Sequence, residues 1–189
     1  MSFKVTTAVF IIVFVVWGQP VSSQAWRIYS DSATYFINQK DPEKAIEYFK
    51  KAKTVIPQDS ILTDTYISIN KSIADAFYIS EDFESAIPAY ENLRYAIASL
   101  YSELNRDYAW TCNMLGVLFN KSGQFDSAQA IHLRAKEIRE KLFGNNHLAY
   151  AQSCNNLGAL YSDMGLWDKA EPLLLEAKAI RATIEPPAD

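Results

Sequence analysis

The chain has 189 residues, of which 49% are hydrophobic and 21% charged, so it is long and apolar enough to build a hydrophobic core. Its formal net charge is −4, and this argues against a nucleic-acid partner because phosphates require a basic footprint. The composition therefore indicates one globular domain or a short repeat array, and it excludes a disordered chain.

Residues 1–23 have the pattern of a secretory signal peptide. Lys4 precedes an unbroken apolar run at 8–17, and Pro20 separates this run from small residues suited to cleavage. The run is too short to span a bilayer, which requires about 20 apolar residues. An uncleaved N-terminal anchor is the alternative. Removal of the segment leaves a net charge of −5, and we expect a secreted or periplasmic protein.

After this segment the sequence repeats itself at a nearly constant interval. The clearest copies are 112–119 and 154–161, and each is followed by a glycine, an aromatic residue and an alanine. The equivalent alanines are spaced by 41, 42 and 42 residues: Ala45, Ala86, Ala128 and Ala170. In the first two copies Lys40 and Glu81 replace the turn glycine. A fixed period of this length predicts an array of stacked structural units.

Each unit reads as two helices joined by a tight turn, because apolar residues recur at helical spacing on both sides of the turn. The predicted units are residues 26–59, 67–103, 108–143 and 150–184. Asp41 is placed to cap a helix and Pro42 to begin it. Pro88 and Pro172 hold equivalent positions inside second helices, and we predict a mild bend there, not a break.

These residues resemble the tetratricopeptide repeat (TPR), whose pattern has Leu-Gly on the first helix, a Gly-x-aromatic turn and an alanine on the second. The period is similar to that of the longer subclass in kinesin light chains and in bacterial secreted proteins, some with caspase-like (CHAT) peptidase domains. The segments 155–157, 170–174 and 179–181 are typical of it. The resemblance implies an all-α fold, a right-handed α-solenoid of about four helix-turn-helix repeats.

The sequence favours no catalytic or cofactor-dependent activity, because it contains no phosphate-binding glycine loop, nucleophile elbow or paired carboxylates. Cys112 and Cys154 occupy the same position in neighbouring repeats, where stacked helices lie ~8–10 Å apart. A disulfide requires Cα atoms within about 7 Å, so we predict two buried thiols and no disulfide. His132 and His147 are too few and too far apart to hold a metal ion. We expect no cofactor and no metal.

The resemblance further implies that the first helices line a concave groove, which places the candidate partner-binding residues there. These residues are Lys71, Tyr78, Asn113, Asn120 and Asn155. An asparagine amide both donates and accepts, so it can hold an extended peptide backbone. Tyr78 is a candidate aromatic anchor. The alternatives are that the asparagines bond neighbouring helices or face water, and that nearby Trp110 belongs to the core.

The leading functional hypothesis is a non-catalytic scaffold that binds a protein or peptide in the groove. One alternative is the sensory or regulatory segment of a larger protein, with a CHAT peptidase or sensor kinase domain elsewhere. Another is a structural module that self-associates, because Leu173, Leu174 and Ile180 cannot all be covered by the first helix of their own repeat.

Overall fold

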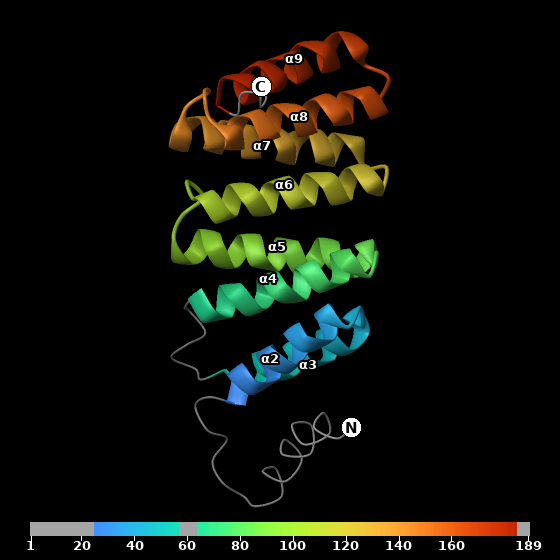
Figure 1. Ribbon diagram of the computed structural model, residues 1–189, viewed down its shortest axis with the longest axis vertical. Coiled ribbons are helices and arrows are strands. Elements are labelled where there is room, and N and C mark those ends of the chain that lie inside the picture. The colour runs from blue at the N-terminus through green and yellow to red at the C-terminus, as the bar shows by residue number, and fades with distance from the viewer. Residues whose placement is uncertain (1–24, 57–63, 185–189) are drawn as a thin grey trace, which may run out of the picture.

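The computed structural model describes residues 25–56 and 64–184, and the predicted signal peptide lies outside this part. The described residues form eight helices and no strand (Figure 1). In chain order these are α2 (Ala25–Asn38), α3 (Pro42–Thr54), α4 (Asp64–Ile79), α5 (Phe83–Leu100), α6 (Arg106–Lys121), α7 (Phe125–Phe143), α8 (Leu148–Asp163) and α9 (Trp167–Ile184). Within these ranges, each helix is too short or too polar to cross a bilayer.

The helices stack in sequence order along the long axis of the molecule, with α2 and α3 at one end and α9 at the other (Figure 1). Each helix packs against the next one in the chain. We call α2, α4, α6 and α8 the A helices and α3, α5, α7 and α9 the B helices. This arrangement confirms the predicted all-α solenoid of helix-turn-helix repeats.

The turn between the A and B helices requires left-handed backbone at one position in every repeat. Gly123 and Gly165 both have φ of 72° there, and Lys40 and Glu81 have φ of 59° and 58°. A residue with a Cβ adopts this conformation at a steric cost that glycine avoids. The first two repeats therefore keep the geometry of the turn although they lack its glycine.

Small residues on the A helices allow the two helices of a repeat to pack closely. A Cβ built on Gly116 would lie 2.4 Å from the His132 ring, and one on Gly158 would lie 2.7 Å from the Leu174 side chain. The equivalent pairs in the first two repeats are Ala33 with Phe49 and Ala74 with Tyr90, all buried. The Leu-Gly signature thus marks a position where a flat or branched side chain lies against bare backbone.

The helix ends follow the capping signals in the sequence. Asp41 and Asp82 accept hydrogen bonds from the backbone amides of Lys44 and Ser85, each at 3.1 Å. Side-chain and backbone hydrogen bonds from those same residues lower the pKa of both carboxyls. α5 and α9 both continue through their internal prolines, as predicted.

Cys112 and Cys154 lie buried in the core as free thiols. Burial raises the pKa of each thiol to about 11. At neutral pH both are therefore protonated and poor nucleophiles.

Candidate functional site

The A helices approach one another directly on one side of the stack. α6 and α8 are in contact although α7 lies between them in the chain. Asn120 Nδ2 donates to Asp163 Oδ2 at 2.7 Å, and the Asn156 amide donates to the Asn113 amide oxygen. A stack curves toward the side on which alternate helices meet, so the A helices line its inner face.

Two of the predicted partner-binding residues, Asn113 and Asn120, form hydrogen bonds between neighbouring repeats. Asn113 is only 8% exposed, and its side-chain oxygen is occupied by Asn156. Asn120 is half-buried and uses its amide group on Asp163. Both side chains hold α6 against α8. Contact of either asparagine with a partner stays a prediction.

Asn155 and Tyr78, two further candidates, lie at separate places on the A helices. Asn155 is half-buried on α8, and its side chain makes no hydrogen bond to another described residue. Tyr78 is half-buried near the end of α4, with its ring 6.4 Å from that of Phe83 on α5. The structure therefore does not gather the five candidates into one cluster.

Lys71, the fifth candidate, lies at the centre of a polar network between α4 and its neighbours. Its Nζ is 2.6 Å from Asp75 Oδ2 and 4.2 Å from the centroid of the Trp110 ring on α6. The hydroxyl of the buried Tyr90 donates to the other oxygen of Asp75. Burial, and then the bond to Asp75, raise the pKa of Tyr90. Asp75 thus joins Lys71 to Tyr90, and Lys71 in turn lies over the Trp110 ring.

A pocket of about 500 Å³ opens beside Lys71, between α4 and α6. Leu93 and Ile97 of α5 line it and are almost fully buried, so they form its floor. Ile67 and Trp110 contribute apolar walls from the two A helices. Ligand pockets of this size commonly combine an apolar interior with a few polar groups.

The acidic groups of this pocket, which we call the α4–α6 pocket, lie at the starts of the flanking helices. Asp64 begins α4 and accepts a hydrogen bond from the Tyr101 hydroxyl, and Asp107 lies in the first turn of α6. The Asn105 side chain accepts from the backbone amides of Asp107 and Tyr108 and so caps α6. One end of the pocket is thus acidic and the other carries Lys71.

Replacing Asn113 by alanine is expected to lower the free energy of unfolding by about 1–2 kcal/mol, because the partly buried Asn156 amide loses its acceptor. Asn155→Ala should change stability by less than about 0.5 kcal/mol, since the half-buried Asn155 side chain makes no hydrogen bond within the described residues. Urea denaturation of the two variants measures the difference. Equal stability of both variants would show that the inter-helix bond contributes nothing.

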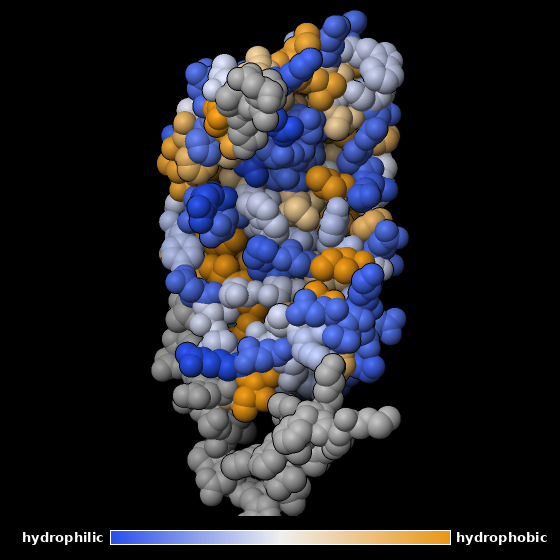
Figure 2. All heavy atoms as spheres, viewed as in Figure 1, coloured by the Kyte–Doolittle hydropathy of each residue, from blue (hydrophilic) through white to orange (hydrophobic). Residues whose placement is uncertain are grey.

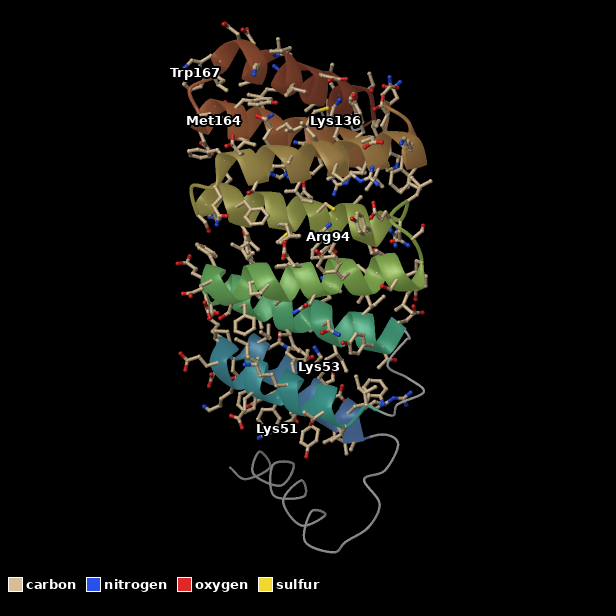
Figure 3. All side chains as sticks on the ribbon, turned by 180° about the vertical axis from the view of Figure 1, so that it is seen from behind. Lys51, Lys53, Arg94, Lys136, Met164 and Trp167 are labelled. Atoms are coloured by element: carbon tan, nitrogen blue, oxygen red, sulfur yellow. The ribbon has the colours of Figure 1, made fainter. Side chains whose placement is uncertain are left out.

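A second set of side chains, which the sequence analysis missed, joins each repeat to the next. On each of the B helices α3, α5 and α7, a cation lies over a tyrosine at the start of the following A helix. The pairs are Lys53 with Tyr66, Arg94 with Tyr108 and Lys136 with Tyr150, with centroid distances of 5.4, 5.9 and 4.7 Å. Figure 3 places the three cations one above another along the stack. Their recurrence at the repeat period was the signal that could have revealed them.

Residues 25–56 and 64–184 contain no group of three or more His, Cys, Asp or Glu side chains that could hold a metal ion. His132 is buried against Gly116, and His147 caps α8 through Nδ1, which accepts from the Ala149 amide at 3.0 Å. Both histidines thus lie in structural positions.

Comparison with known proteins places these observations in a family. Two family models described as the tetratricopeptide repeat match residues 27–59 and 107–183, which together exceed half of the chain. No curated protein matches the sequence.

Among solved structures, BtubC (BKLC) from P. vanneervenii is 29% identical, with a TM-score of 0.76 over 87% of this chain. The chain spans 66% of BtubC, slightly less than two thirds. A kinesin light chain protein with TPR-like repeats from Podospora anserina is 14% identical, with a TM-score of 0.79, over 95% of this chain and 85% of that one. MamA is 19% identical, with a TM-score of 0.63, over 94% of this chain and 88% of that one.

The last two likenesses show the fold alone, and the repeat models add the sequence signature that matches it. The two matched segments include α2 and α3 at one end of the stack and α6 to α9 at the other. The chain belongs to the tetratricopeptide repeat family.

Proposed function

We propose that this protein is a non-catalytic interaction scaffold that binds a peptide or a partner domain on the inner face formed by its A helices. The observation that carries this proposal is the α4–α6 pocket, an apolar recess on that face with hydrogen-bonding groups at both ends. Clefts of this kind orient a ligand through their few polar groups while their apolar floor contributes most of the affinity.

The lining of the pocket favours a ligand with a bulky apolar side chain. Such a side chain would cover Leu93 and Ile97 and stack on Trp110, burying apolar surface on both partners. On the face drawn in Figure 2, hydrophobic side chains surface as separate patches between hydrophilic ones. On that face, recognition would use local anchor points and not one broad apolar surface.

Peptides selected from a displayed random library should bind the wild type and lose at least tenfold in affinity for Ser68→Trp. Ser68 is an exposed pocket residue on α4, so a tryptophan there fills the recess without disturbing the core. The matched control is Ser99→Trp, which fills a different hollow lined by Lys53, Tyr66 and Tyr95. Fluorescence anisotropy with the selected peptides measures both affinities.

Two outcomes would count against the pocket as the recognition site. One is retention of binding by Ser68→Trp, and the other is equal loss in Ser68→Trp and Ser99→Trp. The same peptides also test Asn155→Ala and Tyr78→Ala, which reports on the groove residues that the sequence predicted.

We propose that the protein acts outside the cytoplasm, in the periplasm or after secretion, and this rests on the sequence of residues 1–23 alone. The mass of the chain recovered from an extracytoplasmic fraction tests it, since cleavage removes that segment. We keep two further proposals from the sequence. The array is a regulatory segment of a larger protein, or it self-associates through its C-terminal repeat, where Leu174 is 37% exposed.

A further inference from the structure

The three internal junctions between repeats show which contacts a B helix makes with the A helix that follows it. In each junction a cation of the B helix contacts a tyrosine of the next A helix. At the α7–α8 junction the buried Arg139 also donates to the Ala149 carbonyl at 3.2 Å and to Ser153 Oγ at 3.0 Å. These contacts lie on one side of the B helix, which we call its junction face.

α9 presents the same junction face with no described helix packed on it. By the repeat period, Leu174, Lys178 and Arg181 of α9 correspond to His132, Lys136 and Arg139 of α7. Under α8, His132 is 2% exposed and Arg139 is 6% exposed. Leu174 and Lys178 are instead exposed. Lys178 is thus the fourth cation of the series and has no tyrosine beside it among the described residues.

α2 presents the complementary face, the side of an A helix that receives a B helix. Ile28 of α2 is 48% exposed, whereas its equivalents in the other repeats are buried. Tyr35 is 59% exposed, and its equivalents are fully buried. The buried equivalents are Ile69, Thr111 and Ser153 for the first position, and Ala76, Leu118 and Leu160 for the second. Two large apolar side chains therefore stand on α2 where a preceding B helix would cover them.

We propose that copies of this chain associate head to tail, with the junction face of α9 in one copy packing on the exposed face of α2 in the next. The contact continues the solenoid from one molecule into another and reuses the packing of the three internal junctions. This proposal rests on the self-association through the C-terminal repeat proposed above, and it identifies α2 as the surface that the C-terminal repeat contacts. It is independent of peptide binding in the α4–α6 pocket.

The aromatic residues of α2 supply a partner for Lys178. The position of the junction tyrosine on α2 is Ala25, and Trp26 follows it. Lys53 in the first junction also donates to Asn70 Oδ1 at 2.8 Å, and Tyr29 holds the position of Asn70 on α2. Lys178 of one copy can therefore lie against Trp26 or Tyr29 of the next, as Lys53 lies against Tyr66 and Asn70.

The two faces differ, so the interface is heterologous and each added copy leaves a free face at either end. The test uses the chain expressed from residue 1 and purified as the host delivers it, with its N-terminus determined by mass spectrometry. Light scattering over a range of concentrations should give a mean mass that rises past twice the monomer mass. Tyr35→Glu blocks the α2 face and Leu174→Glu blocks the α9 face, so each variant alone should stay monomeric.

Mixing the two blocked variants distinguishes head-to-tail contact from a symmetric dimer. The mixture retains one intact junction, between α9 of Tyr35→Glu and α2 of Leu174→Glu, and should reach about twice the monomer mass. Lys178→Glu is a second variant that blocks the α9 face, in case Leu174→Glu perturbs folding. Lys178 is exposed, so its replacement should leave the fold intact. The controls are Asn38→Glu and Leu175→Glu. Asn38 is exposed, as are its equivalents in all repeats. Leu133, the equivalent of Leu175, stays 45% exposed although α8 packs on α7. Both control positions therefore lie outside the junctions between repeats.

Three results would overturn the proposal: a wild type that is monomeric throughout, a Tyr35→Glu variant that still associates, or a mixture that stays monomeric. Ser68→Trp should associate normally, because the α4–α6 pocket lies away from both end faces. In the wild type, association without binding of any selected peptide would leave this proposal standing and contradict peptide recognition, and peptide binding by a strictly monomeric wild type would do the opposite.

Discussion

The free energy of unfolding of the wild type is expected to fall as the pH falls from 6.5 to about 4, because of His132. Replacing His132 by leucine should abolish this part of the pH dependence. The His132 side chain is 2% exposed, and its Nδ1 has no hydrogen-bond partner among the described residues. Burial, and then the positive charge of Arg139, lower the pKa of this histidine to about 4. The ring is therefore neutral in the folded protein under conditions that protonate it in the unfolded chain.

The sign follows from proton linkage. Between pH 6.5 and about 4 the unfolded state binds a proton that the folded state does not, so the free energy of unfolding falls as the pH falls. The contribution is fully present above pH 6.5 and is lost by about pH 4. A pKa difference of this size corresponds to about 3 kcal/mol, a large share of the stability of a small domain.

The chain itself supplies a precedent for the substitution, because Leu174 lies against Gly158 as His132 lies against Gly116. Urea denaturation of both proteins at pH 7, 5.5 and 4 measures the effect as a difference, in which carboxylates common to both cancel. His132→Leu should also be the more stable protein at pH 7, since it removes a buried nitrogen without a partner. Parallel pH profiles for the two proteins would contradict the prediction.

The sequence predicted those features that the backbone imposes at single positions. A left-handed residue is required in every A–B turn, and glycine at 123 and 165 marks it. Close approach of the two helices requires a small residue, and Gly116 and Gly158 mark that position. Because such requirements recur at a fixed interval, four repeats and an all-helical stack could be read from the residues.

The sequence analysis left open that the asparagines bond neighbouring helices, but the partners across adjacent A helices could not be predicted, because they depend on how far those helices are separated. Asn113 meets Asn156, which is one position beyond its own equivalent Asn155, and periodicity does not specify that offset. The α4–α6 pocket likewise arises where neighbouring A helices leave the floor of α5 uncovered. The cation–tyrosine pairs, in contrast, follow the repeat period and were accessible in principle.

Replacing Gly116 by alanine is expected to destabilise the protein although alanine is the better helix former. The added Cβ would lie 2.4–2.6 Å from three atoms of the His132 ring, so a buried side chain must move. Overpacking of this kind costs about 1–3 kcal/mol, against a gain of about 1 kcal/mol from helix propensity. We expect a net loss of up to about 2 kcal/mol in the free energy of unfolding, measured with urea at pH 7.

Gly158→Ala is the matched control, because it makes the same change at the equivalent position one repeat later. Its Cβ would meet the Leu174 side chain at 2.7 Å, but in the monomer Leu174 is 37% exposed and can turn away into solvent. The gain in helix propensity then offsets the contact, and stability should change by less than about 0.5 kcal/mol. His132→Leu should recover part of the loss in Gly116→Ala, because a leucine side chain yields more easily than a flat ring. Equal destabilisation by Gly116→Ala and Gly158→Ala would mean that the exposure of the facing side chain does not decide the cost of the extra methyl group.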